Sequence, residues 1–366
     1  MRLFERKEEC CGCGACEAAC AARAIVMKQD KEGFFYPQAD ETRCTGCGAC
    51  LRVCPLKRGE REEKKAPARG YYGARTLRED VRERSSSGGV FSVLADWVLE
   101  REGAVFAAGY GPDLRVAHRE VDGKEQLDRV RRTKYVQSGM DGVYGAIRDR
   151  LAAGRQTLFA GTPCQAEAVR RFLERDGRAD RDRLILVDLV CYGAASPGIW
   201  EKYVRFLGLR YGGKIRDFEF RDKRGKDNGH TVSWKNGSTQ RAYSLYADPY
   251  CRLYFQDLIL RPSCYECPFC RPERESDFTI GDFWGLERIR PDLDDGMGNS
   301  LVIVHSERAE RIWREAAGRC LSFECRLEDL LQPRLAAPTP RPAARERFMK
   351  WYRLLPFWFL LKKYGG

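Results

Sequence analysis

The chain has 366 residues, of which 43% are hydrophobic, and 65 basic against 53 acidic side chains give it a formal net charge of +12. This length suffices for one large domain and a small one, and the lack of an 18-residue uncharged apolar run or of a secretion signal predicts a cytoplasmic protein without a membrane span. The net charge indicates either an anionic partner or a solvated surface of Arg and Glu side chains, and acidic residues interspersed with the basic ones argue against nucleic acid.

The cysteines are the most informative residues, because 17 of them is a high and odd count. Reducing compartments disfavour disulfides, so the count predicts metal ligands or redox chemistry. Eight form a repeat in residues 10–54, CCGCGACEAAC and CTGCGACLRVCP, and both copies spell C-x2-C-x2-C-x3-C. This spacing is typical of a [4Fe–4S] cluster, and in two-cluster ferredoxins the last cysteine of each run binds the other cluster. The predicted ligand sets are Cys10, Cys13, Cys16 and Cys54 for one cluster and Cys20, Cys44, Cys47 and Cys50 for the second.

The repeat predicts a dicluster ferredoxin domain over residues 1–56, with a hairpin-like segment, AIVMKQDKEGFFYP, that turns at Gly33 between the two runs. A pair of zinc sites is the alternative, which the doubled spacing disfavours. Cys11 falls outside the motif and is interpreted as incidental. Residues 57–70 are charged, lack apolar periodicity and are predicted to be a linker.

Helices and strands alternate from residue 71 to 335, which predicts a larger α/β domain with a mixed sheet and an α+β fold for the whole chain. The segment SSSGG, residues 85–89, opens an amphipathic helix in this interpretation. Its serines either cap that helix or form, with free N–H groups, a cradle for phosphate. Residues 336–366 are Pro-rich and then basic and aromatic, so they either pack on the α/β domain or form an interfacial anchor.

Five further cysteines stand where a ligand site is expected. GTPCQ and LVCYG place Cys164 and Cys191 at the ends of two predicted strands. Further along, RPSCYECPFC holds Cys264, Cys267 and Cys270. Ligands of open α/β sheets bind at the carboxyl ends of strands, so these cysteines are expected to converge. Because a tetrahedral zinc or a [4Fe–4S] cluster takes four thiolates, the residues alone leave open which four of the five bind.

The ordered segments SSSGG, KYVQS, GTPCQ, DLVCYG, RPSCYEC and SDFTIGDFWG resemble the coenzyme F-420 hydrogenase/dehydrogenase beta-subunit family, here preceded by a fused dicluster ferredoxin. The resemblance covers residues 1–330 or so. Similar members carry FAD and at least one [4Fe–4S] cluster in the α/β domain, and they pass electrons between iron–sulfur centres and a deazaflavin or another organic acceptor. The resemblance implies a dispensable Cys270 and a third cluster with the ligands Cys164, Cys191, Cys264 and Cys267.

The resemblance also implies roles around the flavin. Tyr192 stands where the family often has His, so proton transfer is either lost or taken over by Tyr192. Asp282 is expected to border the flavin or the substrate. Tyr192 and Asp282 are the predicted catalytic residues. The predicted FAD contacts are Ser87, Gly88 and Gly89 at the phosphates, Lys134, Gln137 and Ser138 at the ribityl chain or ring, and Thr162 and Trp284.

The sequence therefore predicts an iron–sulfur flavoprotein oxidoreductase with three [4Fe–4S] clusters and FAD. It would work with a redox partner protein, a ferredoxin or a hydrogenase/dehydrogenase subunit, and with an organic electron acceptor or donor. The alternative is a non-catalytic electron-transfer subunit that lends clusters and flavin to a partner enzyme. A zinc-stabilised nucleic-acid binder would explain the charge but not the ferredoxin repeat.

Overall fold

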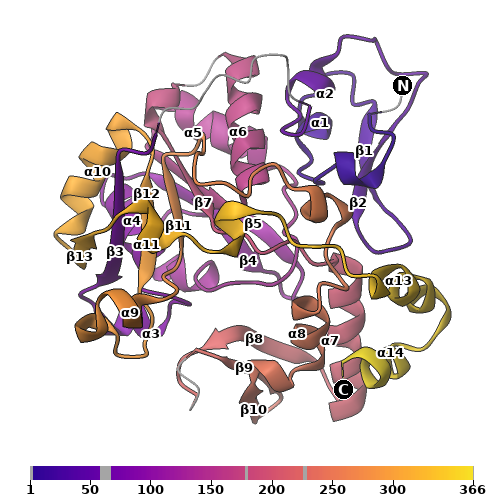
Figure 1. The fold of residues 1–366 in the computed structure, drawn as a ribbon. Coiled ribbons are helices and arrows are strands. Elements are labelled where there is room, and N and C mark those ends of the chain that lie inside the picture. The colour runs from indigo at the N-terminus through magenta and orange to yellow at the C-terminus, as the bar shows by residue number, and fades with distance from the viewer. Residues whose placement is uncertain (1–2, 58–66, 178–179, 226–228, 366) are drawn as a thin grey trace.

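A computed structural model describes residues 3–57, 67–177, 180–225 and 229–365, and within these ranges three β-sheets are surrounded by helices (Figure 1). The predicted linker lies mostly outside the described residues; its last residue, Gly70, begins the first strand of the large sheet. A small N-terminal part precedes a larger part with a mixed sheet, which confirms the predicted α+β fold.

The N-terminal part is an antiparallel hairpin flanked by two short helices. The predicted turn is present, and Gly33 adopts a φ of 83°. Gly14 and Gly48, at φ 78° and 69°, precede the two helices at equivalent places in the repeat, where a side chain would strain the backbone. The elements are α1 (Ala15–Ala18), β1 (Ile25–Gln29), β2 (Phe35–Ala39) and α2 (Ala49–Arg52).

The large sheet has eight strands, and its four central ones run parallel because helices connect them across the faces. These central strands are β11, β7, β6 and β4, so their carboxyl ends lie at one edge; the outer pairings are antiparallel. The order is β13 (Cys320–Glu324), β3 (Gly70–Thr76), β12 (Ser300–Val304), β11 (Phe278–Asp282), β7 (Leu184–Leu189), β6 (Thr157–Gly161), β4 (Ala104–Tyr110) and β5 (Val116–Val121).

Helices cover both faces of this sheet. On one face α4 (Val90–Leu99) and α10 (Glu307–Ala317) share an apolar core with the strands, and on the other face α5 (Val143–Ala152) and α6 (Pro163–Asp176) do so. α5 and α6 also contact α1, which seats the N-terminal part on this face (Figure 1).

The helix after SSSGG differs from the expectation in two ways. α4 begins after Gly89, which has a φ of 85°, and no serine side chain caps it. It is also buried almost all round rather than amphipathic, because the sheet lies on one side of it and α10 on the other.

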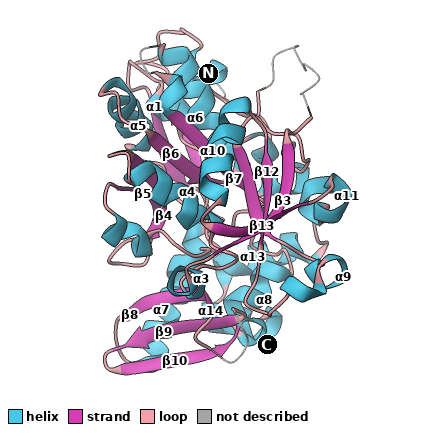
Figure 2. Ribbon diagram, turned by 90° about the vertical axis from the view of Figure 1, so that its left-hand side faces the viewer, coloured by secondary structure: helices cyan, strands magenta, loops and turns pink. Residues whose placement is uncertain are grey.

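A three-stranded antiparallel sheet forms the far end of the molecule, away from the N-terminal part (Figure 2). Its core includes Trp200 and Trp234, and the C-terminal helices add Phe348, Tyr352 and Leu360 to it. The C-terminal segment therefore packs on the domain, as one of the two expectations had it. The elements are α7 (Pro197–Tyr211), β8 (Ile215–Asp222), β9 (Thr231–Asn236), β10 (Thr239–Ser244), α8 (Pro249–Phe255), α13 (Ala344–Leu354) and α14 (Phe357–Tyr364).

Short helices complete the connections. Within the described ranges, none of the helices combines the length and the apolar character needed to cross a membrane. The short α-helices are α3 (Glu79–Glu83), α9 (Leu286–Ile289), α11 (Leu327–Leu330) and α12 (Pro333–Ala336). The 3-10 helices are η1 (Lys7–Glu9), η2 (Lys124–Arg129), η3 (Arg181–Arg183), η4 (Leu245–Ala247), η5 (Pro262–Glu266) and η6 (Pro291–Leu293).

A buried ion pair joins the hairpin to the C-terminal helices. Arg345, at the start of α13, lies 2.9 Å from a carboxylate oxygen of Glu32, and the two side chains are 1% and 8% exposed. Arg345 also donates to the carbonyl of Leu260, so it connects three distant segments. Because both charges have left water, the Arg345 guanidinium depends on Glu32 for compensation, while the other oxygen of Glu32 also lies 3.5 Å from Lys7.

We expect Arg345→Ala to lower the free energy of unfolding by about 1–3 kcal/mol, because it removes the closer partner of the buried Glu32 carboxylate and leaves it with Lys7, 3.5 Å away. Chemical denaturation under anaerobic conditions measures this change. The matched control is Arg347→Ala on the exposed side of α13, which should change the free energy of unfolding by less than about 0.5 kcal/mol. Equal effects of the two substitutions would contradict the assigned role of the ion pair.

Candidate functional site

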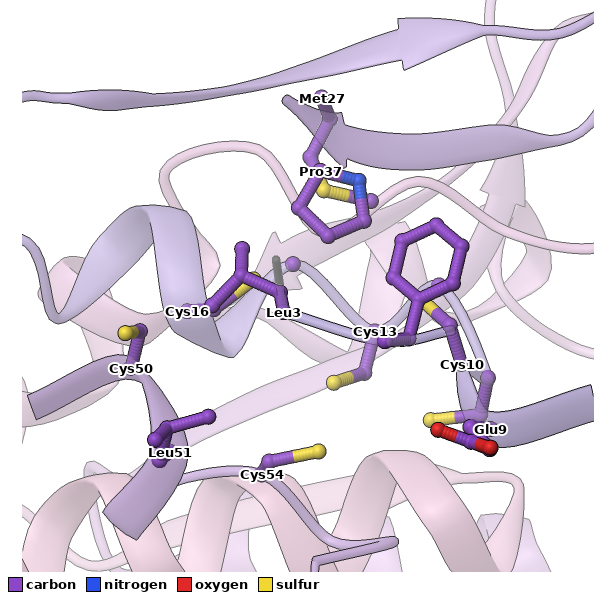
Figure 3. A pocket seen from close by; sticks show the side chains of 14 residues that line it. Leu3, Glu9, Cys10, Cys13, Cys16, Met27, Pro37, Cys50, Leu51 and Cys54 are labelled. Carbon is purple, nitrogen blue, oxygen red and sulfur yellow. The ribbon is translucent and has the colours of Figure 1, made fainter. Parts of the chain in front are cut away.

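The first predicted ligand set gathers around one cavity between the N-terminal loop and α2. Cys10, Cys13, Cys16 and Cys54 all line this space of about 430 Å³, which includes its open mouth. Figure 3 shows the sulfur atoms of Cys10, Cys13 and Cys54 turned toward it. Burial, followed by the neighbouring cysteines, raises the pKa of Cys16 and of Cys54. The four thiols thus share one cavity, which Cys50 also lines, and we call these four the inner set.

The second predicted set, which we call the outer set, is Cys20, Cys44, Cys47 and Cys50. Burial, with Cys20 and Cys47 as further contributors, raises the pKa of Cys50. Cys47 is exposed, and hydrogen bonds from the Ala49 backbone and Thr45 lower its pKa. Cys47 of the outer set is therefore at the surface, whereas Cys50 of the same set and Cys13 of the inner set are buried.

Five further cysteines meet at the carboxyl ends of β6 and β7. We call them the edge cysteines, and they are Cys164, Cys191, Cys264, Cys267 and Cys270. Thr162 caps α6 together with Gln165, which places Cys164 in the first turn, with its sulfur 3.2 Å from the Thr162 hydroxyl. Cys191 follows β7 by two residues. The loop that leads to β11 adds Cys264, whose sulfur accepts a 3.3 Å hydrogen bond from the Ala194 backbone.

The edge cysteines affect one another's ionisation. Burial raises the pKa of Cys191, and Cys264, Cys164 and Cys267 raise it further. Burial and Cys267 raise the pKa of Cys264 to about 12. A hydrogen bond from the Cys267 thiol to Cys270 raises the pKa of Cys267 and lowers that of Cys270. All five side chains are therefore neighbours, including Cys270.

Cys11 joins the inner set to the edge cysteines. Its buried thiol is hydrogen-bonded to both Cys13 and Cys164, and these bonds, with burial, raise its pKa. The bond from Cys11 is also the main reason that the pKa of Cys164 is lowered to about 7. Cys11, interpreted from its position outside the motif as incidental, thus lies between two groups of cysteines, because the fold brings residues 11 and 164 together.

The SSSGG loop lies between β3 and β12. The Gly88 N–H donates to the Ser300 hydroxyl at 3.0 Å, and the Ser87 hydroxyl donates to the Asn299 carbonyl at 2.7 Å. A Cβ at Gly88 would lie 2.4 Å from the Ala74 carbonyl oxygen, so the position requires glycine. The Gly88 N–H is therefore not among the free donors that the phosphate-cradle interpretation assumed.

Cationic side chains surround the SSSGG loop, and they were not among the predicted site residues. Lys223 donates to the Ser87 carbonyl at 2.7 Å, and Arg221 donates to the Ser86 carbonyl at 3.1 Å. Burial, then Arg82 and Arg221, lower the pKa of Lys223 to about 7. These residues lie far from SSSGG in sequence, and no local motif marks them.

Three predicted flavin contacts bind protein groups instead. The Lys134 ammonium donates to the carbonyls of Ala108, Arg131 and Arg132, and burial lowers its pKa to about 7. A contact between Lys134 and FAD would require one of these bonds to break.

The side chains of Gln137 and Ser138 form hydrogen bonds inside the protein. The Gln137 side-chain amide donates to the Cys11 carbonyl at 2.8 Å. The Ser138 hydroxyl is hydrogen-bonded to His118 and Gln165. Their positions therefore support the contact between the N-terminal loop and the sheet edge.

Asp282 and Tyr192 lie at the two ends of an aromatic group, defined as Tyr135, Tyr192, Tyr254 and Phe255. Arg221 donates to Asp282 at 2.9 Å and lies 3.5 Å from the Tyr135 hydroxyl. The Tyr135 and Tyr254 ring centroids are 4.8 Å apart, and those of Tyr192 and Tyr254 are 5.3 Å apart.

Two further observations complete the surroundings of the aromatic group. Tyr254 is also a neighbour of Cys191, which contributes after burial to its raised pKa. Trp284, the remaining predicted contact, is 56% exposed just after β11. The aromatic group thus extends from the SSSGG side of the molecule to the edge cysteines.

Comparisons with known proteins agree with this geometry. Residues 9–57 match the family model of the 4Fe-4S dicluster domain, which makes the chain an iron–sulfur electron-transfer protein. Residues 154–324 match the family model for the C-terminal part of the beta subunit of coenzyme F420 hydrogenase/dehydrogenase. Residues 154–324 are thus similar to the C-terminal part of this beta-subunit family, and a dicluster domain precedes them at residues 9–57.

Two known proteins are similar to this chain. One of the subunits of the F(420)H(2) dehydrogenase of Methanosarcina mazei is 27% identical over 195 residues, which are 50% of this chain and 53% of that protein. The chain thus matches about half the length of this relative. A solved chain of the F420-reducing [NiFe] hydrogenase complex from Methanosarcina barkeri is 15% identical with a TM-score of 0.48, over 83% of this chain and 94% of that chain.

We expect Gly88→Ala to destabilise the fold by about 1–3 kcal/mol, because the added methyl group meets the Ala74 carbonyl and forces the loop away from β3 and β12. Thermal and chemical unfolding measure the effect. The control is Gly145→Ala within α5, where a Cβ would meet nothing closer than 3.9 Å. That substitution should be neutral or stabilising by up to about 1 kcal/mol. A Gly88→Ala protein as stable as the parent would show that the loop tolerates a side chain.

Proposed function

We propose that this chain is an iron–sulfur flavoprotein oxidoreductase that passes electrons between [4Fe–4S] clusters and FAD to reduce or oxidise an organic substrate. The observation that carries the proposal is the double contact of the Cys11 thiol with Cys13 and Cys164. Cys13 of the inner set and Cys164 of the edge cysteines are therefore separated by one side chain, that of Cys11. Electrons that reach the dicluster domain therefore have a route into the large domain that does not cross solvent.

The geometry of the edge cysteines supports a third [4Fe–4S] cluster. Mutual repulsion contributes to the raised pKa of Cys191 and of Cys264, and iron binding relieves such repulsion because the ions neutralise the thiolates. The proposed ligands are Cys164, Cys191, Cys264 and Cys267, while Cys270 stays beside Cys267 without binding iron.

The surroundings of SSSGG support a phosphate site, and FAD is the proposed ligand. Burial and two guanidinium groups disfavour the charged form of Lys223, and a phosphate would restore it. The aromatic group would line the flavin ring between the phosphate site and the edge cysteines. When bound, FAD supplies the exchange between single electrons and a hydride.

Tyr192 and Asp282 are the proposed residues at the substrate. Burial and the neighbouring Asp257 raise the pKa of Tyr192, so its hydroxyl stays protonated at neutral pH and is available as a proton donor. The 2.9 Å hydrogen bond from Arg221 fixes the orientation of the Asp282 carboxylate. The substrate class we propose is a deazaflavin or a similar flat organic acceptor.

The second candidate is a non-catalytic subunit that transfers electrons for a partner enzyme. The names of the two similar proteins favour it, since one is part of a dehydrogenase and the other is a chain of a hydrogenase complex. Anaerobic assays of the isolated chain with a deazaflavin, NAD(P)H and reduced ferredoxin distinguish the candidates. Turnover by the isolated chain supports an enzyme, and turnover only after a partner is added supports the electron-transfer role.

We expect the anaerobically purified protein to contain about twelve iron atoms per chain, from three four-iron clusters, and to release FAD on denaturation. Iron analysis and chromatography of the released flavin measure both. An iron content near eight atoms would remove the third cluster from the proposal. A protein without any flavin would rule out the hydride-transfer mechanism.

We expect Cys164→Ala and Cys191→Ala each to remove about four irons and most of the oxidoreductase activity, because each takes one thiolate from the proposed third cluster. The matched control is Cys270→Ala, which should leave iron content and activity nearly intact. Iron analysis and dye-reduction assays on the three variants decide the ligand set. Cluster loss in the Cys270 variant, with retention in either of the others, would overturn it.

A further inference from the structure

Arg261 links the dicluster domain to the edge cysteines. It precedes η5 by one residue and Cys264 by three, and its side chain is 1% exposed. The guanidinium donates to the Cys10 carbonyl at 2.7 Å and to the Phe35 carbonyl at 3.0 Å. It also donates to the Gln137 side-chain oxygen at 3.1 Å and to the Cys10 sulfur at 3.6 Å.

The charge of Arg261 has no carboxylate counterpart among these contacts. Its acceptors are neutral oxygens and one sulfur, and the guanidinium lies 4.1 Å from the centroid of the Tyr36 ring. Burial disfavours the charged form, but Cys10, Tyr36 and Cys11 outweigh it and raise the pKa overall. A buried cation needs a nearby negative charge, and the thiolates of the inner set are the groups in position to supply one.

The N-terminal loop is shaped to admit this side chain. A Cβ at Gly12 would lie 2.5 Å from a terminal nitrogen of the guanidinium, and Gly12 has a φ of 69°. Any other residue there would push the loop away from Arg261 and strain its own backbone. The close approach of the guanidinium to the loop therefore depends both on Gly12 in the loop and on the hydrogen bonds of Arg261.

We propose that Arg261 is a positioning residue that raises the reduction potential of the cluster bound by the inner set. Reduction adds one electron to that cluster and breaks no bond, so the thiolate-bound cluster becomes more negative. A buried cation and an N–H···S hydrogen bond stabilise the reduced form more than the oxidised form. The inner cluster is thereby favoured to hold the electron at the junction with the large domain. The inference rests on the dicluster domain and is independent of the proposed flavin and third cluster.

The test is an EPR-monitored redox titration of the full-length holoprotein. Arg261→Gln should shift the midpoint potential of one ferredoxin cluster to a more negative value by at least the equivalent of a tenfold change, about 59 mV for a one-electron couple. The outer cluster serves as an internal reference and should not shift. Arg261→Lys keeps the charge and should recover most of the parental potential.

Arg171→Gln is the matched control. Arg171 also donates to the carbonyl of an inner-set cysteine, Cys54, at 2.7 Å, but its charge is paired with Glu167 at 2.6 Å. This variant removes a comparable hydrogen bond without removing an unpaired charge, so the potential should stay near that of the parent. An equal shift in Arg171→Gln and Arg261→Gln would overturn the proposal, as would an unshifted potential in Arg261→Gln with full iron content.

Arg261→Gln could instead fail to assemble its clusters, and Gln137→Glu then decides. This substitution keeps Arg261 and places a carboxylate where an amide oxygen now lies 3.1 Å from the guanidinium. The added charge offsets the cation, so the inner cluster should again shift to a more negative potential. An iron-replete Gln137→Glu protein with the parental potential would refute the role of Arg261.

Discussion

The contact between the N-terminal loop and the sheet edge must exclude water. The other features of the candidate site depend on this exclusion. Residues 10–13 lie against the ends of β6 and β7, and the Tyr144 hydroxyl holds the loop there by donating to the Cys13 carbonyl at 2.8 Å. Thiols from both domains become buried together as a result. In such a low-dielectric setting charges interact strongly, so each charged or polar side chain at the junction has a large effect.

The mixed topology of the large sheet makes this arrangement possible. Parallel β6 and β7 bring their carboxyl ends to one edge, which is where Cys164 and Cys191 emerge. Antiparallel β12 adds a hydroxyl, that of Ser300, to the side of the sheet where SSSGG lies. One sheet thus presents a cysteine-rich end and a cation-rich loop, with aromatic rings between them.

The sequence predicted those features that are local. Cysteine spacing located the dicluster domain, and the two strands predicted before Cys164 and Cys191 are β6 and β7. The failures are non-local. Lys134 binds the Ala108 carbonyl, 26 residues away, in addition to two local ones, and Lys223 reaches SSSGG across more than one hundred residues. The spacing of apolar and polar residues along the sequence does not indicate such partners.

The exposure of Cys47, set against the burial of Cys13, makes the two ferredoxin clusters unequal in durability. Dissolved oxygen and peroxide reach an exposed sulfur directly, but they reach a buried one only when the protein opens. Damage in air would start at the surface and proceed inward. A briefly aerated sample would keep iron and colour in its interior while losing the contact through which electrons enter from outside.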